Sequence, residues 1–199
     1  MQKLVLASNN AGKLREFGQL LAPLDFEVIP QSAFNVPEAE EPYGTFVENA
    51  LAKARHCARL TGLPALADDS GLCVAALGGA PGVRSARYAP TNAGEPKSDA
   101  RNSEHLLNTL VGYQDRRAHY VAVLVFVRHA DDPQPIIAEG EWHGEILSAP
   151  RGEGGFGYDP LFFVPELKAS VAELAAETKN AISHRGKALR LLIEKLKAA

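Results

Sequence analysis

Apolar residues recur along the first part of the chain with spacings that predict alternating strands and helices. Residues 3–7 and 26–30 are short apolar runs, which are typical of strands. Between them, residues 12–24 carry apolar side chains at helical spacing and include a proline near the end, which predicts a helix. The order strand, helix, strand is typical of an α/β protein.

A capping-box pattern predicts where the second helix begins. Thr45 is followed three residues later by Glu48, and the apolar spacing continues to about Thr61. A short buried strand is predicted over residues 64–68, and a turn at residues 70–71 directly after it. The aspartate pair of "LADDSGL" is therefore expected at the end of this strand.

Strands become more frequent in the second half of the chain. Residues 103–112 have a helical pattern, and residues 118–130 and 135–147 predict two long strands that pair antiparallel. A glycine-rich loop over residues 149–160 follows, and residues 184–198 form an amphipathic helix. Together these elements predict an α/β fold with a mixed, partly antiparallel sheet.

Composition narrows the class of protein. The chain has 199 residues, 46% of them hydrophobic and 23% charged, as in ordinary globular proteins. Its net charge of -3 provides no basic field for nucleic acid, and it has no polybasic run for a membrane surface. The longest apolar run, residues 120–127, is too short to cross a bilayer. With no signal-peptide pattern, and with Cys57 and Cys73 lacking metal-ligand spacing, a cytoplasmic protein is expected.

The first segment that could carry chemistry lies where the first strand turns into a helix. It consists of Ser8, Asn9, Asn10, Ala11, Gly12 and Lys13. Free helix N–H groups there favour an anion, Gly12 allows close approach to the backbone, and Lys13 supplies a cation. The segment is not a Walker A motif. The alternative is that Asn10 simply caps the helix.

Acidic side chains form the second candidate. Asp68 and Asp69 at a strand end could hold Mg²⁺, which prefers oxygen ligands. The alternative is an Asx turn in which both carboxylates are solvated. The loop "EAEE", residues 38–41, offers further carboxylates but could equally be a solvated acidic stretch.

An aromatic residue between glycines forms the third candidate. Phe156 stands between Gly155 and Gly157, where it could offer a stacking surface for a base or could be a packed loop aromatic. Lys179, His184 and Arg185 follow near the last helix, a set that suits recognition of an anion or a carbonyl oxygen.

The order of these blocks resembles one family from end to end. The blocks are "SNNAGK", "TFVENALAKA", "ADDSGL", "LGGAPGVRSARY", "GGFGYDP" and "ISHRGKAL". They resemble the non-canonical purine nucleoside triphosphate pyrophosphatases, the HAM1-like inosine/xanthosine triphosphate pyrophosphatases. The chain departs from the pattern at Glu153, where a small or hydroxyl residue is usual, and at Ser8, where threonine is frequent.

The resemblance implies hydrolysis of ITP, dITP or XTP to the monophosphate and pyrophosphate, with Mg²⁺ as cofactor. It also implies a homodimer in which residues 1–199 form a single domain. The implied fold is an elongated mixed sheet with flanking helices that form two lobes around a central nucleotide cleft.

The resemblance also implies roles for individual residues. The phosphates would be held by Ser8, Asn9, Asn10, Ala11, Gly12, Lys13 and Lys53, with Ser70 also touching the substrate. Mg²⁺ would be held by Glu41 and Asp69, with Glu40 and Asp68 as alternates. Asp69 would be the general base. The purine would be bound by Phe156, Gly157, Tyr158, Asp159, Lys179, His184 and Arg185.

Other functions remain to be weighed against this one. A phosphomonoesterase or a kinase-like enzyme with Asp68 as nucleophile would need a D-x-D arrangement or a Walker A motif, and the sequence has neither. A non-catalytic nucleotide-binding module is the alternative that the motifs alone do not distinguish.

Overall fold

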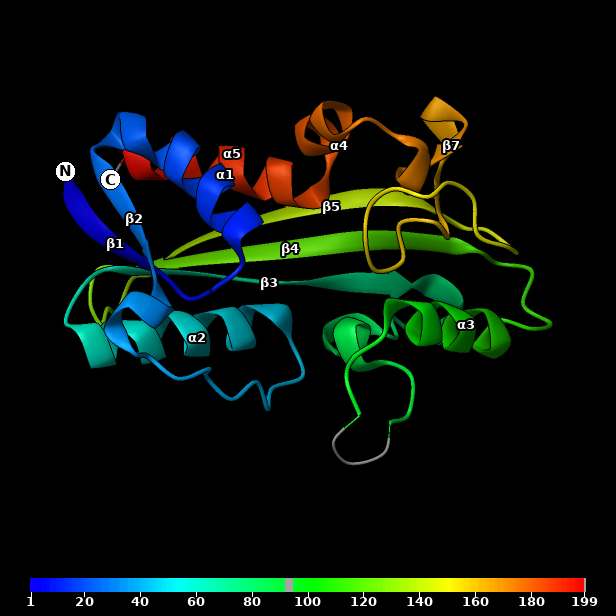
Figure 1. The fold of residues 1–199 in the computed structure, drawn as a ribbon, viewed down its shortest axis with the longest axis horizontal. Coiled ribbons are helices and arrows are strands. Elements are labelled where there is room, and N and C mark those ends of the chain that lie inside the picture. The colour runs from blue at the N-terminus through cyan, green and yellow to red at the C-terminus, as the bar shows by residue number, and fades with distance from the viewer. Residues whose placement is uncertain (92–94, 199) are drawn as a thin grey trace. The chain divides into compact units, whose positions relative to one another are not determined.

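The computed structural model describes residues 1–91 and 95–198. Helices and strands alternate at the start of the chain, and strands cluster later (Figure 1). The strands are β1 (Gln2–Leu6), β2 (Phe26–Pro30), β3 (Ala65–Val74), β4 (Arg117–Val127), β5 (Ile136–Ile146), β6 (Phe162–Val164) and β7 (Ala169–Ser170). The helices are α1 (Ala11–Leu21), α2 (Phe46–Thr61), α3 (Asp99–Thr109), α4 (Ala176–Ile182) and α5 (His184–Ala198). No helix in these described ranges is both long and apolar enough to cross a lipid bilayer.

The described strands form one seven-stranded sheet in the order β2-β1-β3-β4-β5-β6-β7. β1 pairs in parallel with β2 and β3, whereas β6 pairs antiparallel with β5 and β7. β4 and β5 are neighbours joined only by residues 128–135, a connection too short for a parallel crossover, so they too are antiparallel. The predicted α/β class with a mixed sheet is confirmed.

The chain divides into two compact units, each with its own core. Unit 1 comprises Met1–Asp69, Ala122–Glu139 and Ala188–Ala199, and unit 2 comprises Ser70–Val121 and Gly140–Lys187. The core of unit 1 contains Leu4, Leu6, Phe17, Leu21, Leu66, Ala122, Leu124, Phe126, Ala138, Ala188, Leu189 and Leu192. The core of unit 2 contains Leu72, Val74, Leu106, Leu110, Ala118, Tyr120, Trp142, Ile146, Tyr158, Leu161, Phe162, Val164 and Val171.

Within unit 1, helices cover both faces of the strands. In Figure 1, α1 and α5 lie on one side of β1 and β3, and α2 lies on the other. Burial on both faces explains why the apolar positions of β4 form a continuous run rather than an alternating pattern.

Helix starts follow the predicted caps. The Thr45 hydroxyl oxygen accepts the Glu48 N–H at 3.3 Å, and α2 then runs to Thr61 as expected. The second half of the capping box differs, because the Thr45 hydroxyl donates to the Glu48 carboxylate at 2.6 Å. α1 ends at Leu21, so the predicted end of this helix near residue 24 is wrong by one short 3₁₀ turn.

One local prediction is wrong in a way that matters for function. The turn expected at residues 70–71 does not form, because β3 continues without interruption from Ala65 to Val74. Asp68 and Asp69 therefore lie in the middle of a strand. Apolar side chains on either side of the pair, Leu66 and Leu72, are buried and hold the strand in place.

Two helices also differ from expectation. α3 begins at Asp99 rather than near residue 103, because the Ser98 hydroxyl oxygen caps it by accepting the Arg101 N–H at 3.3 Å. α4 has only seven residues and was not predicted. So short a segment carries too few apolar positions to show a helical period.

Candidate active site

The segment from Ser8 to Lys13 joins β1 to α1 in unit 1. Asn10 caps the helix, since its Oδ1 accepts the Lys13 N–H at 3.0 Å, and its own N–H donates to Ser8 Oγ at 3.2 Å. The capping alternative is therefore observed. Ala11 and Gly12 form the exposed first turn of α1, where the positive end of the helix dipole favours an anion.

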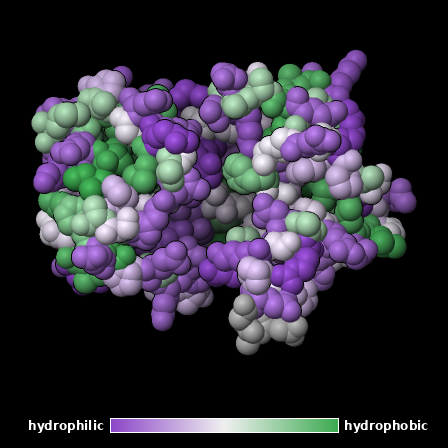
Figure 2. All heavy atoms as spheres, viewed as in Figure 1, coloured by the Kyte–Doolittle hydropathy of each residue, from purple (hydrophilic) through white to green (hydrophobic). Residues whose placement is uncertain are grey.

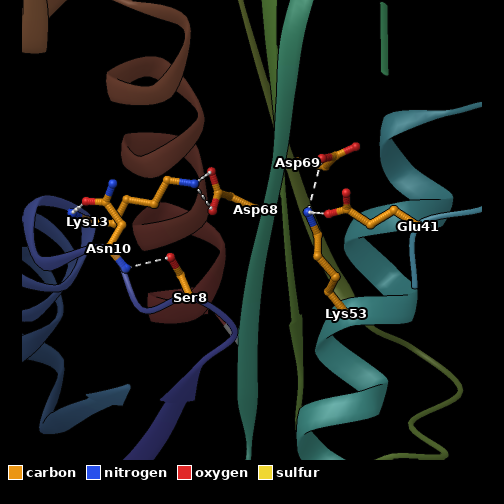
Figure 3. Close-up of polar contacts among 7 residues, drawn as sticks. All are labelled: Ser8, Asn10, Lys13, Glu41, Lys53, Asp68 and Asp69. Carbon is orange, nitrogen blue, oxygen red and sulfur yellow. Dashed lines mark hydrogen bonds and ion pairs between the residues drawn. The ribbon is translucent and has the colours of Figure 1, made fainter. Parts of the chain in front are cut away.

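Asn9 joins this segment to the turn after β2. Its Oδ1 accepts the Ser32 N–H at 3.1 Å, which fixes the approach of the chain to α1. Of the predicted phosphate ligands in the segment, Asn9 and Asn10 thus have structural partners, while the Lys13 side chain extends away from the loop (Figure 3).

The two adjacent aspartates point to opposite faces of β3 (Figure 3). The Lys13 ammonium donates to both oxygens of Asp68 at 2.8 Å, and Asp68 is only 4% exposed. On the other face, the Lys53 ammonium donates to Asp69 Oδ1 at 3.0 Å. Each carboxylate thus has its own lysine, and this pairing relieves the repulsion between the adjacent charges.

Lys53 also brings a third carboxylate to the Asp69 face. Its ammonium donates to Glu41 Oε1 at 2.7 Å, so Glu41 and Asp69 converge on one cation. Burial opposes the charge on Lys53, but the two carboxylates outweigh it and raise the pKa of Lys53 above its usual value. The structure brings together Glu41, Lys53 and Asp69; Glu40 is exposed, and Asp68 lies on the other face.

The carboxyl group of Asp69 is only partly satisfied. Its Oδ2 is buried and forms no hydrogen bond with any of the described residues. Burial raises the pKa of Asp69, and Lys53 together with the Asn49 side chain offsets this only in part. A buried carboxylate oxygen without a partner is costly, so this atom is available for a ligand.

The acidic side chains around Lys53 fit Mg²⁺ in number and kind. Within residues 1–91 and 95–198, no three His, Cys, Asp or Glu side chains gather as a complete protein-made metal cage. Mg²⁺ is commonly held by one or two carboxylates, with water and substrate phosphates supplying the remaining oxygens. Glu41 and Asp69 would supply two such carboxylates, and Asp69 Oδ2 is an oxygen that lacks a partner among the described residues.

In unit 2, a buried aspartate organises the glycine-rich loop. Asp159 is 3% exposed, and its Oδ2 accepts the Phe156 N–H at 2.8 Å and the Lys179 ammonium at 2.5 Å. Its Oδ1 lies 3.5 Å from the Tyr120 hydroxyl. A carboxylate with these partners is better suited to holding the loop than to contacting a base.

Phe156 is held at its backbone while its ring faces solvent. The residue is 61% exposed, so the alternative of a packed loop aromatic is wrong. The Lys179 ammonium lies 4.1 Å from the centre of the ring, a cation–π contact that covers part of one face.

The remaining residues predicted to bind the substrate from unit 2 have the following places in the structure. The Tyr158 hydroxyl donates to the Ser85 carbonyl at 2.8 Å, and Tyr158 is buried. The His184 ring stacks on Tyr120 with centroids 4.8 Å apart and an interplanar angle of 13°. Arg185 follows in the first turn of α5, and Ser70 lies within β3.

The sequence did not predict one residue that supports this loop. The Asp99 carboxylate, in the first turn of α3, accepts the Gly157 N–H at 2.7 Å. An aspartate in a first helical turn is usually explained by the helix dipole alone, so no sequence signal pointed to a loop more than fifty residues away.

The fold and these side chains define an α/β protein with a lysine-bridged carboxylate pair in one unit and an exposed aromatic loop in the other. A model of the Ham1 family matches residues 4–195, and the chain belongs to that family. Proteins named dITP/XTP pyrophosphatase from Ralstonia nicotianae and Neisseria meningitidis are 66% and 61% identical to it. These alignments cover 99% and 98% of this chain and 98% and 96% of the relatives.

Solved structures agree with this assignment. A HAM1 protein from Coxiella burnetii has a TM-score of 0.95 at 50% identity and covers 100% of both chains. The Ham1 protein of Staphylococcus aureus has a TM-score of 0.91 at 42% identity and covers 99% of each chain. The family predicted from the sequence blocks is confirmed.

Substitution of two loop glycines tests the support of Phe156. Gly155 and Gly157 both have positive φ, 78° and 61°, so alanine strains the backbone at each by about 1 kcal/mol. Only at Gly155 would the added Cβ overlap the Asp159 carboxylate. Gly155→Ala should therefore lower the melting temperature more than Gly157→Ala, and equal melting temperatures would show that Asp159 does not hold the loop this closely.

Proposed function

We propose that this chain hydrolyses non-canonical purine nucleoside triphosphates, such as ITP, dITP and XTP, to the nucleoside monophosphate and pyrophosphate. The proposal draws on relatives that match almost the whole chain and are named dITP/XTP pyrophosphatase. The observation that carries it is the convergence of Glu41 and the half-buried Asp69 on Lys53. This activity would remove deaminated purines from the nucleotide pool.

Asp69 is the proposed general base. In the reaction, a water oxygen bonds to one of the two phosphorus atoms that flank the α–β bridging oxygen. The bond from that phosphorus to the bridging oxygen breaks, so the monophosphate and pyrophosphate separate. Asp69 takes a proton from the attacking water. Burial raises the pKa of Asp69, which moves its basicity toward the range that suits proton transfer near neutral pH.

Lysines and a helix end are proposed to hold the phosphates. Lys53 and Lys13 each carry an ammonium that is now paired with a carboxylate, and a triphosphate would compete for it. The backbone from Ser8 to Lys13 leads into the start of α1, where N–H groups and the helix dipole favour an anion. Hydrolysis of a phosphoanhydride needs mainly positioning and charge stabilisation of this kind.

Glu41 and Asp69 are the proposed Mg²⁺ ligands. When bound, Mg²⁺ would neutralise charge on the phosphate oxygens. Asp68 was an alternate ligand from the sequence, but its two oxygens both accept from Lys13 on the opposite face of β3, which favours Asp69. Glu40 is exposed, and no contact with Lys53 or Asp69 supports it as a ligand.

Unit 2 is proposed to recognise the purine. Phe156 would stack on the ring, while Lys179, His184 and Arg185 would supply hydrogen-bond donors to its edge. Hypoxanthine and xanthine have an oxygen acceptor at position 6, where adenine has an amino donor. A site lined by donors would leave polar groups unpaired with adenine, which can lower the specificity constant by several powers of ten.

The chain is also proposed to form a homodimer, as its resemblance to the family implies. Sedimentation equilibrium should give twice the mass of one chain. A mass near 21.3 kDa, that of a single chain, would exclude the dimer.

A panel of nucleotides tests the proposed reaction. Pyrophosphate release should be rapid with ITP, dITP and XTP, much slower with GTP and ATP, and abolished by removal of divalent metal with EDTA. Ion chromatography separates pyrophosphate from orthophosphate. Orthophosphate as the first product, or equal rates with ATP and ITP, would contradict the proposal.

Replacement of Asp69 tests its role as the base. Asp69→Asn should lower kcat by about 10²- to 10⁴-fold while nucleotide binding is largely kept, because the amide cannot accept the proton. Asp131→Asn provides the control, since the Asp131 side chain is 91% exposed and distant in sequence from the site. An Asp69→Asn protein with an unchanged kcat would favour the non-catalytic binding module.

A further inference from the structure

Residues 37–44, named here the strap, carry Glu41 but have neither helix nor strand. They lead into α2 and run beside it (Figure 1), and hydrophilic side chains dominate this part of the surface (Figure 2). A segment without regular structure needs other contacts to hold a carboxylate in a fixed place. Three contacts with α2 supply them.

The three contacts follow one stripe of α2. Asn49, Lys53 and His56 are spaced i, i+4 and i+7, so they lie on one side of the helix. They meet Tyr43, Glu41 and Pro37 of the strap respectively. The strap therefore runs antiparallel to α2, and the contact of Glu41 with Lys53 lies between the other two.

Asn49 holds the strap at the Tyr43 peptide. Its Oδ1 accepts the Tyr43 N–H at 3.1 Å, and its Nδ2 donates to the Tyr43 carbonyl at 3.2 Å. Asn49 is 2% exposed, so it is held firmly by its surroundings. Two hydrogen bonds to one residue fix both the position and the orientation of the backbone.

His56 holds the other end. Its Nε2 lies 3.0 Å from the Pro37 carbonyl oxygen, which can only accept, so Nε2 carries the proton. Between the two ends, the strap stands off the helix except at the ion pair of Glu41 with Lys53. A hollow of about 470 Å³ separates Ala39, Glu40 and Pro42 from the outer face of α2 around Leu51 and Arg55.

The three contacts between the strap and α2 would respond differently to a bound substrate. The ion pair of Glu41 with Lys53 is the one that a cation or a triphosphate would disturb under the proposed function. The contacts of Asn49 and His56 with the strap are hydrogen bonds to its backbone, and neither a cation nor a triphosphate would replace them. The Asn49 side chain also lies beside Asp69, whereas the His56 side chain contacts the strap carbonyl of Pro37. The hydrogen bonds to the strap would keep Glu41 beside Asp69 when Lys53 is drawn away.

We propose that Asn49 and His56 are positioning residues that hold the Glu41 carboxylate at the metal site. This inference rests on the proposed function, because it assumes that Glu41 binds a divalent cation. Neither residue is assigned contact with the substrate or the metal.

Mn²⁺ binding and hydrogen exchange of the full chain test this inference. The concentration of free Mn²⁺, measured by electron paramagnetic resonance, gives a Kd without nucleotide. Asn49→Ala and His56→Ala should each raise this Kd by about 2- to 10-fold, as expected for the loss of a net hydrogen bond. Asn49→Ala should also accelerate exchange of the Tyr43 amide. His56→Gln, which keeps a donor, should restore part of the affinity.

A second buried asparagine provides the matched control. Asn102 is 4% exposed and accepts the Ala89 N–H at 2.9 Å in unit 2. Asn102→Ala should lower the melting temperature as Asn49→Ala does, but it should leave the Mn²⁺ Kd and Tyr43 exchange unchanged. Because the Asn49 side chain also lies beside Asp69, the His56→Ala and His56→Gln variants isolate the effect of the strap. They carry the test alone if Asn49→Ala does not fold.

Two outcomes would overturn the inference. One is a Mn²⁺ Kd that stays within twofold of the wild-type value in both alanine variants, or that Asn102→Ala raises equally. The other is a wild-type chain that binds no Mn²⁺. Pyrophosphate release by the same wild-type sample tests the proposed function separately, so either result can be assigned to the inference or to the function.

Discussion

Alternation of side chains along β3 determines the candidate active site of unit 1. Successive side chains of a strand point to opposite faces, so Asp68 and Asp69 are adjacent in sequence but separated by the sheet. α1 and α2 cover these two faces, and each supplies one lysine. Removal of either lysine would take away the cation that neutralises its carboxylate, which is destabilising at so little exposure.

The two ion pairs leave their carboxylates in different states. Both oxygens of Asp68 accept from Lys13, whereas Asp69 uses Oδ1 with Lys53 and keeps Oδ2 buried without a partner among the residues described. The second face also holds Glu41, which adds negative charge where Asp69 already lies. A metal cation is therefore proposed beside Asp69 rather than beside Asp68, whose two oxygens already accept from Lys13. Two adjacent letters of the sequence could not make this distinction.

The sequence predicted the features that depend on neighbouring residues, such as helix caps and the bounds of an amphipathic helix. Thr45 and Asn10 cap their helices as their side chains suggested, and α5 begins and ends as its amphipathic spacing required. The course of β3 was missed because Ser70 and Gly71 favour a turn in isolation, while pairing with neighbouring strands and burial of Leu72 stabilise the extended chain.

Long-range contacts mark the limit of sequence reasoning. The bond from the Gly157 N–H to Asp99 and the clamp of Asn49 on Tyr43 are set by tertiary structure. Asn49 lies in a recognised sequence block, yet its position in a helix gives no sign that its amide serves a neighbouring loop. The family blocks could imply that Glu41 and Asp69 act together, but only the fold shows which lysine they share.

The two units hold their functional loops by the same physical means. In each, a buried polar side chain bonds to the backbone of an irregular segment: Asn49 to Tyr43 in unit 1, and Asp159 to Phe156 in unit 2. When a loop is held through its backbone, its candidate functional side chain does not need to pack against the protein to keep the loop in place. Phe156 can therefore remain 61% exposed while its backbone is held by Asp159, and a backbone already held loses less conformational entropy if a ligand covers the ring.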